Sequence, residues 1–213
     1  LQNKNYTVKT LNLLAENSVP ADARTVIIAG PVKPLSPAEV GILNQYVQQG
    51  GSLIIMEDPI PLTDFGDAPD PLAESLSQAW GIRLRNDFVV DTASTTIQNA
   101  IGATYNPTHP ITNAMTLVTI FPLARSIEVS AQPTESITLT SLVETDPNSQ
   151  AWGETDFTPL EQANASVSLD PADTPGPLTL VAAGENTTNM GRVVVFGNSV
   201  FATDEGFDAF GNG

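Results

Sequence analysis

The chain has 213 residues, no cysteine, and a formal net charge of −16 from 24 acidic and 8 basic residues. Without cysteine there is no disulfide, no thiolate nucleophile and no Cys-based metal site. A surface this acidic repels the phosphates of nucleic acids and anionic lipids, which excludes both as partners. No apolar run reaches the roughly 18 residues that a membrane span needs, and the length predicts a single domain over residues 1–213.

A helix with well-defined ends is predicted over residues 36–49. Ser36 offers an N-cap hydroxyl, Pro37 occupies the first helical position, and Glu39 follows three residues after the cap. This is a capping box with proline in the one turn that tolerates it. The pair Gly50-Gly51 supplies the left-handed stop.

Apolar strands flank this helix on both sides, over residues 26–30 and 53–57. A strand, a helix and a strand joined by short turns predict a right-handed parallel βαβ unit. Neither strand alternates apolar with polar residues, so we expect helices on both faces of the sheet.

Further elements extend this pattern. A second helix is predicted over 71–80, and further strands over 87–91 and 192–197. We therefore expect an α/β fold whose mainly parallel central sheet contains all four strands. Residues from about 125 to 176 contain short strand-like runs and then a segment rich in Asp, Pro, Asn and Thr. We interpret them as a loop or β-rich excursion from the same domain.

Polar or turn-forming residues follow the predicted strands. In doubly wound sheets, ligands bind beyond the carboxyl ends of the strands. This position predicts a ligand-binding crevice at these residues: Pro31, Asp58, Asp91, Asn198 and Ser199. The alternative is that Asp58 merely caps a strand and that the neighbouring glycines serve tight turns.

His109 is the only histidine, so any Ser-His-Asp or His-metal mechanism depends on it. It lies in the turn Thr108-His109-Pro110, where a structural role competes with ligand binding. No phosphate-binding loop is present, and the acidic loops match no EF-hand spacing. We therefore expect no catalytic residue, no metal and no cofactor.

Several segments, taken in order, resemble one family. They are Val26-Ile-Ile-Ala-Gly-Pro, Leu35-Ser-Pro-Ala-Glu, Tyr46-Val-Gln-Gln-Gly-Gly-Ser-Leu-Ile-Ile-Met-Glu-Asp-Pro, Thr108-His-Pro-Ile-Thr and Gly191-Arg-Val-Val-Val-Phe-Gly-Asn-Ser-Val-Phe. Together they resemble the auxiliary component of gliding-motility-type ABC transport systems, an uncharacterised family related to the N-terminal domain of an intraflagellar transport protein. The resemblance covers about residues 6–203.

The resemblance implies a flavodoxin-like three-layer sandwich similar to class I glutamine amidotransferases, without their cysteine nucleophile. It also implies a fragment of a longer membrane-anchored protein, located on the extracytoplasmic face and associated with ABC transporter membrane or ATPase subunits. We expect a non-catalytic interaction domain. Two alternatives remain open: a polysaccharide-binding domain that uses Trp152 and Phe157, and a hydrolase that uses His109 with Ser199 or Asp58.

Overall fold

The computed structural model describes residues 5–162, 166–204 and 206. Its elements follow in chain order: α1 (Leu13–Glu16), β1 (Thr25–Ala29), α2 (Pro37–Gln48), β2 (Ser52–Met56), η2 (Ile60–Leu62), α3 (Pro71–Trp80), β3 (Ile82–Leu84), β4 (Phe88–Asp91), β5 (Asn99–Tyr105), β6 (Thr119–Pro122), β7 (Ile127–Val129), β8 (Ile137–Thr145), β9 (Ala151–Glu154), α4 (Thr158–Glu161), β10 (Thr174–Pro175), β11 (Thr179–Asn186), β12 (Arg192–Phe196) and η3 (Val200–Ala202).

The predicted βαβ unit is confirmed. Ser36 Oγ accepts a hydrogen bond from the Glu39 amide at 3.3 Å, and Glu39 Oε2 accepts one from the Ser36 amide at 2.9 Å. This capping box starts α2, and Gly50, with φ +89°, turns the chain toward β2. β1 and β2 pair in parallel, with Ile27 opposite Ile54.

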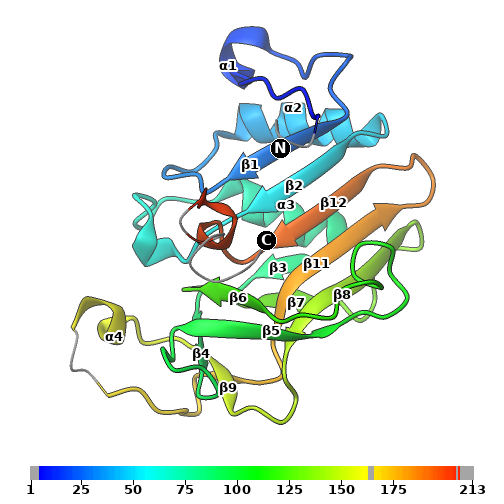
Figure 1. Cartoon of the computed structure of the whole chain (residues 1–213). Helices are drawn as coiled ribbons and strands as arrows, with labels where there is room; N and C mark the ends of the chain where they lie inside the picture. The colour runs from blue at the N-terminus through cyan, green and yellow to red at the C-terminus, as the bar shows by residue number, and fades with distance from the viewer. Residues whose placement is uncertain (1–4, 163–165, 205, 207–213) are drawn as a thin grey trace.

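The sheet that contains this unit is mixed, and most of it is antiparallel. Nine strands belong to it, and its main path runs β1-β2-β12-β11-β8-β5-β6, while β7 pairs with β11 and β3. Only β1, β2 and β12 are parallel neighbours. The other pairs are antiparallel, and this part of the sheet curls into a half-barrel (Figure 1). The expected flavodoxin-like, amidotransferase-like three-layer sandwich with a mainly parallel sheet is therefore wrong.

The strand predicted at 87–91 lies outside the parallel part of the sheet. It forms β4, which pairs antiparallel with β9 in a separate sheet of three strands. All four residues of β4 are buried because Val89 packs into the core under the antiparallel strands, while Phe88 and Val90 pack with Trp152. Its continuous apolar run therefore reflects burial between two sheet layers, where helices had been expected.

Helices cover one face of the parallel strands only. α2 and α3 both lie behind the sheet in Figure 1 and pack on Val26, Leu53 and Val193. On the opposite face, Phe201 of η3 stacks on Phe196 with ring centroids 5.0 Å apart. The expectation of helices on both faces is wrong, since the curled strands and η3 bury part of the second face instead.

Candidate functional site

The carboxyl ends of β1, β2 and β12 meet at one edge, which brings two of the predicted residues together. Asp58 Oδ1 accepts a hydrogen bond from the Ser199 amide at 2.7 Å, and Asp58 Oδ2 accepts one from the Ser199 hydroxyl at 2.6 Å. Gly30 lies against this pair, since a Cβ there would come within 2.6 Å of Ser199 Oγ. Pro31, the next residue, therefore starts its loop beside the Asp58–Ser199 pair.

Asn198 follows the same strand but faces the interior. Its side chain is fully buried, its Nδ2 donates to the Pro122 carbonyl, and its Oδ1 accepts from the Phe201 amide at 3.0 Å. These bonds join the end of β12 to β6 and to η3. The side chain contributes to the packing of the two halves of the sheet, and its predicted role in ligand binding stays a prediction.

The remaining predicted residues lie elsewhere. Asp91 is buried at the end of β4 and accepts hydrogen bonds from the Ala93 and Ile101 amides, both at 3.1 Å. His109 is half-buried in the connection between β5 and β6, where its Nδ1 accepts from the Ile111 amide at 3.3 Å. Neither side chain has a hydrogen bond to Asp58 or Ser199 within the described parts of the chain.

A buried carboxyl that sequence reasoning missed lies next to Asp58. Glu57 is 1 % exposed, and neither of its carboxyl oxygens has a hydrogen-bond partner among the described residues. Burial, followed by the nearby Asp70 carboxyl, raises the pKa of Glu57 to about 8. With this pKa, the Glu57 carboxyl holds a proton at neutral pH.

Arg125 is the cation of this region. The residue is 3 % exposed, and its Nε and Nη2 donate to the Arg85 and Leu84 carbonyls at 2.7 and 3.3 Å. Its Nη1 has no hydrogen-bond partner in the part of the chain that the structure describes. Burial lowers the pKa of Arg125, and Glu57 and Asp70 oppose that effect. An arginine inside a mostly apolar stretch was the sequence signal for this arrangement.

Asp87 is the second buried acid near Arg125. Its carboxylate accepts from the Ser126 amide at 2.7 Å and from the Ser126 hydroxyl at 2.5 Å. Burial raises the pKa of Asp87, and the two bonds from Ser126 oppose the rise. We call the group formed by Glu57, Asp58, Asp70, Asp87, Arg125 and Ser199 the strand-end cluster.

The strand-end cluster lacks the parts that acyl transfer needs. The Ser199 hydroxyl is bonded to a carboxylate, and a serine nucleophile requires a base such as an imidazole within hydrogen-bond reach. In the described residues, no three His, Asp or Glu side chains are grouped to hold a metal ion. Among the helices that the structure describes, none combines the length and apolarity needed to cross a membrane.

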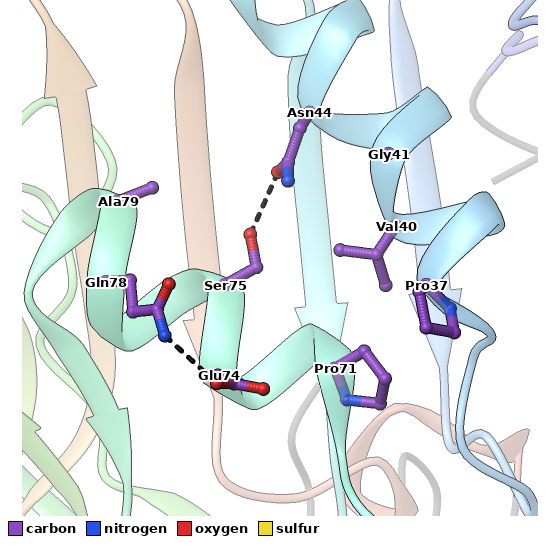
Figure 2. A pocket seen from close by; sticks show the side chains of 9 residues that line it. All are labelled: Pro37, Val40, Gly41, Asn44, Pro71, Glu74, Ser75, Gln78 and Ala79. Carbon is purple, nitrogen blue, oxygen red and sulfur yellow. Dashed lines mark hydrogen bonds between the residues drawn. The ribbon is translucent and has the colours of Figure 1, made fainter.

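A shallow groove of about 470 Å³ runs between α2 and α3. Figure 2 shows the Ser75 hydroxyl pointing across it to Asn44, with a hydrogen bond of 3.0 Å between the helices. The other residues that line it are Pro37, Val40, Gly41, Pro71, Glu74, Gln78 and Ala79. One carboxylate and no imidazole line the groove, so it assembles no catalytic set.

The aromatic residues considered for sugar binding are used in packing. Trp152 is 7 % exposed, and its Nε1 donates to the buried Glu154 carboxylate at 3.1 Å. The Phe157 ring lies against Phe88, with centroids 5.9 Å apart. A sugar-binding platform needs an exposed aromatic face, and Trp152 does not offer one.

Comparisons with known proteins address the resemblance seen in the sequence. A family model described as an ABC-type uncharacterized transport system matches residues 1–206, which confirms the suspected family. No curated protein matches the chain.

Among solved structures, the chain is similar to the N-terminal domain of mmIFT52, at 17 % identity and a TM-score of 0.68 over 99 % of this chain and 81 % of that one. Weaker likenesses include a putative ThuA-like protein from Bacteroides uniformis, at 14 % identity and a TM-score of 0.43 over 83 % and 60 % of the two chains. Another is the exo-β-1,4-mannosidase Op5Man5 from Opitutaceae bacterium strain TAV5, at 20 % identity and a TM-score of 0.41. That match covers 86 % of this chain and 22 % of the mannosidase chain. The first likeness shows the fold.

Proposed function

Since the chain belongs to the family of ABC-type uncharacterized transport systems, we propose that it is a non-catalytic interaction domain of the auxiliary protein of such a system. The domain works on the extracytoplasmic face and binds the membrane subunit of the transporter. The family supports the association with transport, and the acidic surface is compatible with an extracytoplasmic location.

The observation that carries the non-catalytic role is the pairing of Asp58 with Ser199. Both carboxylate oxygens of Asp58 accept hydrogen bonds from Ser199 at 2.6–2.7 Å. At the edge where α/β enzymes hold catalytic groups, this carboxylate is therefore already engaged by a neighbouring side chain and amide. His109 has its Nδ1 bonded to the Ile111 amide in a different part of the sheet.

The first test measures binding and hydrolysis on the same protein. We expect the chain to capture the purified, detergent-solubilised membrane subunit of its transporter, and to hydrolyse p-nitrophenyl esters and glutamine no faster than buffer. Substitutions Ser199→Ala and His109→Ala serve as controls. Hydrolysis by the wild type that either substitution abolishes would overturn the non-catalytic role, and absence of binding would overturn the interaction role.

The location is tested by cysteine labelling, because the chain has no cysteine of its own. Thr188→Cys places a thiol at an exposed position, and Ala182→Cys places one in the core. In intact cells that express the full protein, we expect a membrane-impermeant maleimide to label the first variant and not the second. Labelling of Thr188→Cys only after permeabilisation would contradict the extracytoplasmic location.

A further inference from the structure

The acidic residues are unevenly distributed along this chain. Although the chain has 24 Asp and Glu residues, the stretch 92–127 contains none. The side chains in that stretch that can carry a positive charge are His109 and Arg125, and Arg125 is buried. This part of the chain therefore lacks the negative charge that the rest of the sequence carries.

The same stretch displays apolar side chains to solvent. It forms β5, β6 and their connection, at the end of the curled sheet opposite β1 (Figure 1). We call residues 106–118 the apolar loop. Its large apolar side chains are 42–76 % exposed: Ile111 52 %, Met115 42 %, Leu117 76 % and Val118 55 %. Four such side chains within eight residues form the kind of patch that marks an interaction site.

Hydrogen bonds hold the start of the apolar loop in one conformation. Asn106 Oδ1 accepts from the Thr108 amide, the Thr108 hydroxyl and the His109 amide at 2.9–3.1 Å. The Asn106 amide donates to the Leu142 carbonyl at 2.9 Å, which fixes this turn to β8. The buried Thr112 hydroxyl donates back to the Asn106 carbonyl at 2.8 Å.

His109 extends this network to the apolar side chains. Its carbonyl accepts from the Thr112 and Asn113 amides at 3.0 and 2.9 Å, and its Nδ1 accepts from the Ile111 amide at 3.3 Å. At the other end, the Tyr105 hydroxyl donates to the Leu117 carbonyl at 2.8 Å. The loop is thus fixed at both ends before any partner binds, which lowers the entropy cost of association.

We propose that the apolar loop is the docking element of this domain, and that it inserts Leu117 and Val118 into an uncharged, apolar groove of a partner protein. His109 is a positioning residue that holds the loop in its binding conformation. This inference rests on the proposed function, because the partner is the membrane subunit of the transporter.

Charge favours a partner protein over two other possible binding partners of the apolar loop, a second copy of the chain and an anionic membrane. Two copies of the chain each carry −16 and repel one another. An anionic membrane attracts exposed Lys or Arg, and the stretch 92–127 exposes neither. A neutral groove of a protein matches the apolar loop in both charge and polarity.

The test compares two double variants in the full chain. In Leu117→Ser with Val118→Ser, the tip of the apolar loop becomes polar. The matched control is Leu14→Ser with Val32→Ser, which changes side chains that are 59 % exposed at the other end of the sheet. Dissociation constants for the membrane subunit are measured with both. We expect at least a tenfold weaker affinity for the loop variant and less than a twofold change for the control.

Each other outcome has a defined meaning. Equal binding by the wild type and the loop variant overturns this inference but leaves the proposed function in place, whereas absence of binding by the wild type overturns both. Sedimentation of the wild type as a dimer that the loop variant dissociates would assign the loop to self-association. Flotation of the wild type with phosphatidylcholine vesicles, lost in the loop variant, would assign it to a membrane. Either result overturns the inference.

The positioning role of His109 has its own readout. We expect His109→Ala to accelerate amide hydrogen exchange at Ile111, Thr112 and Asn113 and to weaken binding, with Leu117 and Val118 intact. His109→Asn, whose side-chain oxygen can accept the Ile111 amide, is expected to restore both. Unchanged exchange in His109→Ala, or the same loss of binding in both variants, would contradict this role.

Discussion

The two ends of the nine-stranded sheet differ in which side chains they bury and which they expose. Near the β1 end, the strand-end cluster buries the carboxyl groups of Glu57 and Asp87, and the half-buried Asp58 pairs with Ser199. At the β5–β6 end, the apolar loop turns Leu117 and Val118 outward from a stretch without acids. In this comparison, ionisable side chains are buried or half-buried at the first end, and apolar side chains are exposed at the second. Stability should therefore depend on the first end and recognition on the second.

The largest expected effect is a pH dependence of stability caused by Glu57. Its pKa is about 8 when folded and near the ordinary 4.5 when unfolded, so the folded chain retains a proton that the unfolded chain releases. The free energy of unfolding should therefore be highest below pH 4.5, fall as the pH rises to about 8, and level off above it. The loss is on the order of 4 kcal/mol for a shift of this size.

Urea unfolding between pH 5 and 9 checks this dependence. Glu57→Gln cannot ionise at this position, so we expect its stability to fall less between pH 5 and 8 than that of the wild type and to exceed it above pH 8. Glu74→Gln, an exposed position on α3, serves as the control and should keep the wild-type profile. A wild-type profile that is flat across this range would show that Glu57 is not a buried neutral acid.

The second effect concerns the contact between the residue after β12 and the segment between β6 and β7. A Cβ on Gly197 would lie 1.9 Å from the backbone carbonyl oxygen of Arg125, which cannot move like a side chain. We expect Gly197→Ala to lower the free energy of unfolding by about 3 kcal/mol. Gly41→Ala is the matched control: a Cβ there meets no atom within 4 Å, and the substitution should stabilise α2 by up to about 1 kcal/mol. Equal effects of the two substitutions would refute the close contact.

A smaller effect is expected at the Asp58–Ser199 pair. Ser199→Ala removes the hydroxyl bond and keeps the amide bond, at a cost of about 1 kcal/mol, whereas Asp58→Ala removes both at about 2 kcal/mol. In a double-mutant cycle, Ser199→Ala should therefore cost little once Asp58→Ala is present, because the hydroxyl bond is already lost. If the two changes in the free energy of unfolding were strictly additive, the two side chains would not interact.

The smallest effect belongs to the apolar loop. Leu117 and Val118 are exposed, so we expect their double substitution by Ser to change the free energy of unfolding by less than about 0.5 kcal/mol. Thermal unfolding followed by circular dichroism measures this change. A loss above 2 kcal/mol would show that these side chains support the fold, which would remove the contrast between the two ends.

Local signals predicted some elements of this fold well. The capping box of Ser36 and Glu39 gave the start of α2, and Asp70 with Gly81 set the limits of α3, because caps depend on neighbouring residues alone. The strand at 88–91 was misplaced because a continuous apolar run indicates only that both faces of a strand are buried. It does not indicate whether helices or other strands cover those faces.

The candidate site was less predictable. Asp58 and Ser199 could be placed at one edge from the βαβ pattern, and their contact confirms that placement. That Glu57 is a buried acid depends on how Asp70 and Arg125 return to it from distant elements, which no local pattern encodes. The acid-free stretch 92–127 was visible in the sequence as an interval without Asp or Glu.

The position of β12 in the sheet sets the order in which this protein can fold during synthesis. β12 lies between β2 and β11, although residues 57–191 separate it from β2 along the chain. The ribosome thus releases the βαβ unit with the edge of β2 unpaired, and β12 follows only after the intervening residues 57–191. Contacts of such long range form slowly, and open strand edges attract other chains in the meantime. A nascent chain of this protein should need protection by chaperones until residue 196 has emerged.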